Sequence, residues 1–175
     1  MTDWKRRIPT IMTSQELLDR AFARASKAEV PGTVPFDTVK KTNLAKINGI
    51  GDMTVTTLLK YVRAFPRMEK EDEFFSQLVD VVIGLDGLKK ALSSMTWCAE
   101  KASHLQRMYT HKVKKAPNID TVAKVTREFY GRFSSIIKQI DKDLLFAQKA
   151  RDALKQLPMW ESRSSPRGYP PPSRP

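Results

Sequence analysis

Hydrophobic residues recur every three or four positions over most of the chain, a spacing that is typical of amphipathic α-helices. The first such stretch follows Thr13-Ser14-Gln15-Glu16, whose T-x-x-E pattern fits a helix-capping box. The apolar residues of this stretch share one helical face: Leu17, Leu18, Ala21, Phe22 and Ala25. Proline and glycine in residues 31–35 then predict a loop.

A second helical pattern covers residues 37–65. The step Phe65-Pro66 should end it, because the residue before a proline disfavours helical backbone angles. Within this pattern, the sequence Asn48-Gly49-Ile50-Gly51 predicts an interruption. A third helix is expected from about residue 71, followed by a turn over residues 84–87 and a fourth helix to about residue 115.

The last element is the most regular one. Apolar residues step by three or four from Val122 to Leu157, which predicts a single helix over Ile119 to Leu157. Its roughly 39 residues would form a rod of about 58 Å. Since no stretch alternates as a strand would, the predicted fold class is all-α: an elongated helical bundle with a long C-terminal helix and a disordered tail.

The ends of the chain differ from the middle in composition. Residues 159–175 contain five of the 11 prolines and show no hydrophobic periodicity, which predicts disorder. We therefore expect a basic N-terminal arm over residues 1–13, a helical bundle domain over residues 14–158 and a disordered tail rich in arginine, proline and serine over residues 159–175.

The net positive charge of the chain indicates a class of function, the binding of polyanions. Lys and Arg number 31 against 19 Asp and Glu, and the net charge of +12 favours binding to polyanions, nucleic acid before an anionic membrane. The basic residues gather in three short stretches, which gives the candidate nucleic-acid-binding residues Lys5, Arg6, Arg7, Lys40, Lys41, Arg107, Lys112, Lys114 and Lys115.

One local motif offers a more specific alternative. The stretch from Asn43 to Val62 resembles a helix-hairpin-helix, whose L-x-x-I-x-G-I-G core would use Gly49 and Gly51. In such a motif the glycines permit a tight turn, and free amides at the next helix start face a phosphate. The alternative hypothesis is therefore a DNA-binding protein without sequence specificity.

Catalytic and metal chemistry find little support. A phosphate loop and a nucleophile elbow are both missing from the sequence, and Cys98, His104 and His111 do not have a recognised zinc spacing. Enzymatic activity in this chain is not expected. No apolar run is long enough for a membrane span, and the N-terminus does not resemble a signal peptide. Helical spacing favours core positions for the aromatic residues Phe74, Phe75, Trp97, Tyr109, Phe129 and Tyr130, and for Cys98.

Three segments together resemble the N-terminal helical domain of the nucleolar GTP-binding protein family, Obg-related GTPases that act in assembly of the large ribosomal subunit. They are "IPTIMTSQELLDRAFARASK" (Ile8 to Lys27), "VRAFPRMEKEDEFFSQLVDVVIGLDGLKKALSSMTW" (Val62 to Trp97) and "REFYGRFSSIIKQIDKDLLFAQKARDALKQLP" (Arg127 to Pro158). The three segments occur in the same order as in the family and extend over most of residues 5–158. The compactness of this region is similar to that of archaeal members of the family.

The resemblance implies that a GTPase domain follows this helical domain in cis, and that domain is lacking here. No cofactor is therefore expected in this chain, and GTP with magnesium is implied only for the intact family member. The implied partners are ribosomal RNA and large-subunit precursors, without a membrane. The implied location is the cytoplasm, or the nucleolus in a eukaryote. A third hypothesis is a protein-interaction bundle whose basic surface is incidental.

The tail also has a genetic interpretation. Met159-Trp160-Glu161-Ser162-Arg163 can be encoded so that a reading frame shifted by two nucleotides gives Val-Gly-Lys-Ser, the centre of the family's phosphate loop. The hypothesis is that residues 159–175 are translated out of frame. Sequencing the locus tests it.

Overall fold

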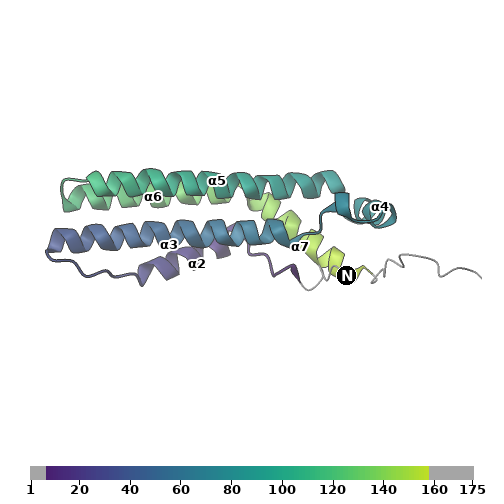
Figure 1. Cartoon of the computed structure of the whole chain (residues 1–175), viewed down its shortest axis with the longest axis horizontal. Coiled ribbons are helices and arrows are strands. Elements are labelled where there is room, and N and C mark those ends of the chain that lie inside the picture. Colours follow the sequence, from purple (N-terminus) through teal and green to yellow (C-terminus); the bar gives the residue numbers. More distant parts are fainter. Residues whose placement is uncertain (1–6, 158–175) are drawn as a thin grey trace, which may run out of the picture.

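The computed structural model describes residues 7–157, and the predicted tail, Lys5 and Arg6 lie outside this range. Its helices are α2 (Ser14–Ser26), α3 (Pro35–Ala64), the short 3-10 helix η1 (Met68–Lys70), α4 (Glu73–Val82), α5 (Leu85–Lys115), α6 (Ile119–Gln139) and α7 (Asp141–Gln156). They form an elongated bundle in which α3 and α5 lie side by side along the long axis (Figure 1). The all-α prediction is confirmed, since residues 7–157 contain no strand.

The bundle is built around the antiparallel pair α3 and α5. Helix α2 packs on α3, α6 packs along α5, and α7 crosses near the start of α5 (Figure 1). The start of α3 therefore meets the end of α5, where the Lys40 ammonium donates a hydrogen bond to the Ala116 carbonyl at 3.3 Å. The opposite end of the pair carries η1 and α4.

Local sequence signals set the helix starts. The capping box at Thr13 forms: the Glu16 amide donates to the Thr13 hydroxyl at 3.2 Å, and the Thr13 amide donates to the Glu16 carboxylate at 3.1 Å. Gly84 separates α4 from α5 with φ of 89°, a left-handed conformation that favours glycine. The turn predicted over residues 84–87 is thus confirmed at Gly84, whereas residues 85–87 already belong to α5.

Helix α3 is continuous, so the interruption expected at residues 48–51 is wrong. Gly49 and Gly51 both have helical backbone, and the turn that a helix-hairpin-helix needs does not form. The physical reason is burial. Ile47, Ile50 and Leu58 are fully buried on one face of α3, and their packing holds the helix through both glycines.

The single helix expected over residues 119–157 is also wrong, because it divides at Ile140 into α6 and α7. The apolar spacing continues through the break because Ile140 and Leu144 are both buried. The change of direction lets α7 pack on α5, where the Phe146 ring lies so close to Gly87 that a Cβ there would be 2.7 Å from Cζ. Glycine at this position therefore permits the crossing.

Aromatic side chains fill the middle of the bundle. Tyr109, Phe129 and Phe133 are fully buried, with ring centroids 5.6 Å apart for the first pair and 5.2 Å for the second. Phe75 and Cys98 are buried as expected. The expectation that Trp97 and Phe74 lie in the core is wrong, since 38% of Trp97 and 55% of Phe74 are exposed.

Candidate nucleic-acid interface

The predicted basic residues of α3 and α5 meet at one end of the bundle. We define the basic end as the start of α3, with Lys40 and Lys41, together with the last turns of α5, which carry Arg107, Lys112, Lys114 and Lys115. Two stretches separated by about 70 residues in sequence are adjacent here because α3 and α5 are antiparallel, as the bond from Lys40 to the Ala116 carbonyl shows. The end of α5 is also the favourable end of a helix dipole for cations.

Some of these cations are already paired. The Lys41 ammonium lies 2.9 Å from the Asp37 carboxylate, and its hydrogen bond is the main reason that the pKa of Asp37 is lowered. The Lys112 ammonium lies 3.8 Å from the Glu128 carboxylate and 4.6 Å from the centre of the Tyr109 ring. These two lysines therefore have less charge available for a ligand.

Glu128 is the centre of a small network on α6. The Tyr109 hydroxyl donates to its carboxylate at 2.7 Å, and the Arg132 guanidinium lies 3.2 Å away. The hydrogen bond from Tyr109, with the nearby cations, lowers the pKa of Glu128. Burial, together with the carboxylate, raises the pKa of Tyr109 to about 12, so its hydroxyl remains a hydrogen-bond donor at neutral pH.

Arg107, Lys114 and Lys115, by contrast, have no ion pair within residues 7–157. Arg107 and Lys114 line a depression of about 270 Å³, which we call the α5 pocket. Its other lining residues are Asn48, Gln106, Thr110 and His111. Cationic and amide groups around one hollow are suited to oxyanions.

Polar contacts fix the floor of the α5 pocket. The Gln106 amide donates to the Asn48 side-chain oxygen at 3.2 Å and to the Asp52 carboxylate at 2.9 Å, and the Thr110 hydroxyl donates to Asn48 at 3.2 Å. These bonds join α3 to α5 at mid-length. They also engage Asp52, which is the acidic group nearest to the pocket along α3.

A larger hollow of about 800 Å³, which we call the α2 groove, lies between α3 on one side and α2 with the segment before it on the other. Its cations are Arg20, Arg24 and Lys60, and none of them has an ion pair in the described part of the chain. The remaining lining residues are Pro9, Thr10, Met12, Gly49, Asp52, Met53, Thr56, Thr57 and Tyr61. The groove thus combines cations, hydroxyls and apolar surface.

The two predicted glycines have different surroundings. A Cβ at Gly51 would overlap the Gln106 side chain, so this glycine allows α3 and α5 to approach closely. A Cβ at Gly49 would meet no atom within 4 Å, because Gly49 faces the open α2 groove. Neither residue presents a free helix-start amide, since both lie inside α3.

The basic arm is not brought to the basic end within the described residues. Arg7 is exposed and comes immediately before a segment that packs on α7, where the Gln148 amide donates to the Ile11 carbonyl at 2.6 Å. Helix α7 lies in the half of the bundle that also holds α4 (Figure 1). Arg7 is therefore separate from the cations of α5.

Sequence reasoning missed Arg20, Arg24 and Lys60 because they come from two helices and form no run along the chain. The available signal was the spacing of Arg20 and Arg24, four residues apart on the polar face of α2. Pairing α2 with α3 was needed to add Lys60.

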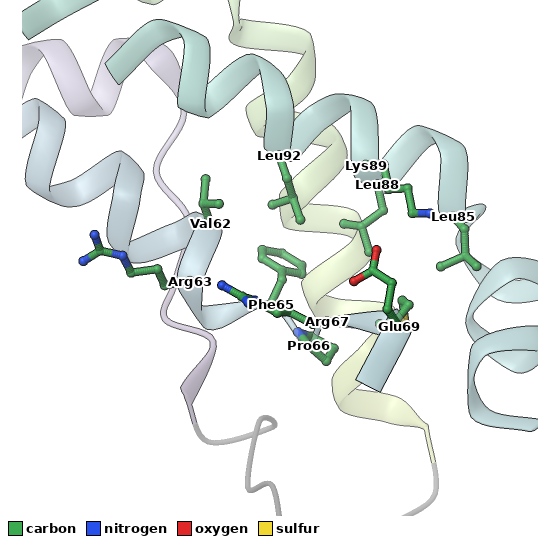
Figure 2. Close-up of a pocket in the computed structure, with 11 residues that line it drawn as sticks. Val62, Arg63, Phe65, Pro66, Arg67, Glu69, Leu85, Leu88, Lys89 and Leu92 are labelled. Carbon is green, nitrogen blue, oxygen red and sulfur yellow. The ribbon is translucent and has the colours of Figure 1, made fainter. Parts of the chain in front are cut away.

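The far end of the bundle has a mixed charge. Residues 63–90 carry six carboxylates and five cations. Beside them, a depression of about 250 Å³ is floored mainly by apolar side chains, including Phe65, Leu88 and Leu92 (Figure 2). Arg63, Arg67, Lys89 and Glu69 also line it. None of the sequence-predicted cations lies there, so this depression is not part of the candidate interface.

Neither a metal cluster nor a membrane-spanning helix is found in residues 7–157. No group of three or more His, Cys, Asp or Glu side chains there could hold a metal ion. None of the described helices combines the length and the apolar character that a bilayer crossing requires.

Comparison with known proteins agrees with the architecture. The family model "NOG1 N-terminal helical domain" matches residues 6–160. An uncharacterized protein of Methanocaldococcus jannaschii is 29% identical over 163 residues, which is 89% of this chain and 46% of the relative. Nucleolar GTP-binding protein 1 is 22% identical over 157 residues in Caenorhabditis elegans and 20% identical over 158 residues in Saccharomyces cerevisiae.

The chain therefore spans about half the length of the archaeal relative and about a quarter of the eukaryotic ones, 23% and 24% in the two cases. The matched region runs through all the helices of the bundle, from α2 to α7. Because one family model covers nearly the whole chain, this protein belongs to the family of NOG1 N-terminal helical domains, the helical part of nucleolar GTP-binding proteins.

Proposed function

We propose that this chain is the RNA-contacting helical domain of a GTPase that acts in assembly of the large ribosomal subunit, and that it binds ribosomal RNA through its basic end. The observation that carries the proposal is the gathering of cations from α3 and α5 at that end, with Arg107, Lys114 and Lys115 free of ion pairs within the described residues. Family membership supplies the biological setting.

The physics of the proposal is counterion release. Each phosphate neutralised by a lysine or arginine frees condensed cations from the RNA, and this gain is independent of base sequence. The basic end has no acidic residue between His104 and Ala116, so this segment of α5 carries only positive formal charge. An RNA backbone is therefore attracted to the last three turns of α5.

GTP chemistry belongs to another part of the intact protein in this proposal. The family match covers a helical domain, and the helices of residues 7–157 enclose an apolar core. GTP and magnesium would be bound by a GTPase domain in cis, and the present chain would hold neither. We expect a cytoplasmic location, or a nucleolar one in a eukaryotic cell.

The test uses charge reversal at the two ends of one helix. Lys114→Glu with Lys115→Glu should weaken binding of a labelled ribosomal RNA fragment by at least about tenfold at 100 mM salt, because two phosphate contacts become repulsive. The matched control is Lys89→Glu with Lys90→Glu, an exposed pair at the start of α5 with the same change in net charge. Equal losses in both double variants would show nonspecific attraction and refute the assignment of the basic end.

The protein-interaction hypothesis predicts a different result. A bundle that binds only protein should show no retention of RNA, or an affinity that stays flat between about 50 and 200 mM salt. Cofractionation of the intact family protein with large-subunit precursors, lost on the Lys114 and Lys115 substitutions, would support the RNA-contacting role in the cell.

A further inference from the structure

The α2 groove is a large hollow for which the proposed function gives no role. It measures about 800 Å³, within the size range of small-ligand sites, and it lies on the side of α3 next to α2. Three features describe it: cations without an ion pair in the described residues, hydroxyl groups and apolar side chains. A ligand that matches all three carries phosphates together with flat, partly apolar groups.

The cations of the groove come from both walls. Arg20 and Arg24 are four residues apart on α2, and Lys60 comes from the last two turns of α3. The only acidic residue in the lining is Asp52, whose carboxylate already accepts a hydrogen bond from Gln106 at 2.9 Å. The electrostatic character of the groove is therefore that of an anion site.

The apolar part of the lining consists of Pro9, Met12, Met53 and Tyr61. Tyr61 is held in place, since its hydroxyl accepts a hydrogen bond from the Met12 amide at 3.2 Å. Tyr61 itself is buried, whereas Met12 and Met53 are only partly buried. A rigid duplex presents phosphates and sugars to a protein and keeps its base faces stacked inside. An unpaired nucleotide can instead place a base against this methionine surface while its phosphate meets an arginine.

Helix α3 places the α2 groove next to the α5 pocket. Gly49 and Asp52 line the groove, while Asn48, one residue before Gly49, lines the α5 pocket. Successive residues are rotated by about 100° around a helix, so the two hollows share the outward face of α3 at this turn. Gly49 has no side chain, and nothing beyond the adjacent backbone of α3 lies within 4 Å of its Cβ position. The surface of α3 between the α2 groove and the α5 pocket is therefore open at this residue, and we call this opening the passage.

We propose that a single-stranded RNA segment crosses α3 at Gly49, with phosphates at Arg107 and Lys114 on one side and one or two unpaired nucleotides in the α2 groove on the other. This inference rests on the proposed function and adds a ligand class, single-stranded RNA, and a second set of binding residues, Arg20, Arg24 and Lys60. Gly49 serves as the crossing point because any larger side chain would narrow the passage.

The decisive variant closes the passage without disturbing the fold. Gly49→Leu adds a good helix former where the structure is open, and Gly131→Leu is its matched control, because a Cβ at Gly131 in α6 also meets no atom within 4 Å. The probes are a fluorescein-labelled oligouridylate of about ten nucleotides and a duplex RNA of the same length, measured by fluorescence anisotropy.

We expect Gly49→Leu to weaken oligouridylate binding by about tenfold, the size of one lost base contact, and Gly131→Leu to change it by less than about twofold. Arg20→Gln with Arg24→Gln should weaken binding and reduce the slope of log K against log salt by about 1.4, since each phosphate contact to a single strand contributes about 0.7. Circular dichroism should show unchanged helix content in all variants.

Three results would overturn the inference. Gly49→Leu could bind oligouridylate as well as Gly131→Leu does, the arginine substitutions could leave the salt slope unchanged, or the duplex could bind more tightly than the single strand. Any of these would leave the proposed function intact if Lys114→Glu with Lys115→Glu still weakened RNA binding by at least about tenfold. A wild-type chain that binds neither probe would refute the proposed function and the inference together.

Discussion

Alanine substitutions at Gly49 and Gly51 should change stability in opposite directions, although the two residues are only two positions apart in α3. Both have helical backbone, so alanine removes the conformational penalty of glycine in a helix, about 1 kcal/mol at an exposed site. At Gly49 the added methyl group meets open space. We therefore expect Gly49→Ala to raise the free energy of unfolding by about 1 kcal/mol.

At Gly51 the gain from removing the conformational penalty of glycine is offset by the disturbance of Gln106. The methyl group would overlap the Gln106 side chain, which must move and give up its bonds to Asn48 and Asp52. Each bond contributes roughly 0.5–1.5 kcal/mol, so the loss is about 1–3 kcal/mol. The expected net change for Gly51→Ala lies between about zero and a destabilisation of 2 kcal/mol, which puts the two variants about 1–3 kcal/mol apart.

Urea unfolding followed by circular dichroism measures this difference directly, and thermal unfolding should show it as roughly 2–4 °C per kcal/mol for a chain of this size. The comparison also tests the continuity of α3. If residues 48–51 formed a hairpin turn with glycine-specific backbone angles, both alanine variants would be destabilised. Loss of stability in Gly49→Ala would therefore refute the continuous helix and restore the helix-hairpin-helix hypothesis.

Three further predictions concern titration, reactivity and salt. The pKa of Glu128 is lowered in the folded state, so its ion pairs stabilise the fold above the unfolded pKa of about 4.3, and this contribution is lost as pH falls through the folded pKa. The difference in unfolding free energy between wild type and Glu128→Gln should therefore be constant above about pH 5.5 and shrink below about pH 4. A difference that grows on acidification would contradict the network around Glu128. Burial raises the pKa of the Cys98 thiol to about 12, so a thiol-reactive dye should label Cys98 only upon unfolding, and rapid labelling of the native chain at pH 7.5 would show that the site opens. If the chain contacts about five phosphates through Arg20, Arg24, Lys60, Arg107 and Lys114, affinity for single-stranded RNA should fall about 100-fold between 50 and 200 mM salt, whereas a fall below about fivefold would indicate at most one contact.

Most of the helices were predictable because their signals are local. The capping residues before α2, the proline after Phe65 and the glycine before α5 each act within a few residues, and the structure confirms all three boundaries. The continuity of α3 was not predictable from local signals. Glycine weakens a helix by about 1 kcal/mol, and the packing of Ile47, Ile50 and Leu58 against other helices exceeds that penalty.

The division between α6 and α7 is the opposite case, because here the helix breaks although the hydrophobic pattern continues. Ile137, Ile140 and Leu144 keep helical spacing, and all three are buried, so the hydrophobic pattern is the same for a straight rod and for a bent one. The bent arrangement brings Phe146 onto Gly87, which joins residues 59 positions apart. Only the arrangement of α7 on α5 reveals it.

In the candidate site, too, some residues could be predicted from sequence, whereas others come together only in the fold. Lysines that follow one another in α5 were selected from sequence, and the antiparallel pairing of α3 and α5 places the end of α5 beside Lys40. Lys112, however, is partly neutralised by Glu128, a partner that sequence did not suggest. Arg20, Arg24 and Lys60 converge only after α2 folds onto α3.

The separation of charge along α5 has a kinetic consequence. This helix has 31 residues and therefore spans about 46 Å, with lysines at its end and residues 63–90, of mixed charge, near its start. If the domain binds RNA as proposed, an RNA surface attracts the lysine-rich end of α5 more strongly than the end of mixed charge, so the domain experiences a torque that turns its basic end forward during approach. Encounters then become productive from many starting orientations, and the association rate falls with ionic strength as the Debye length shrinks below the length of the rod. In the proposed orientation, α4 lies at the end of the bundle that points away from the RNA (Figure 1).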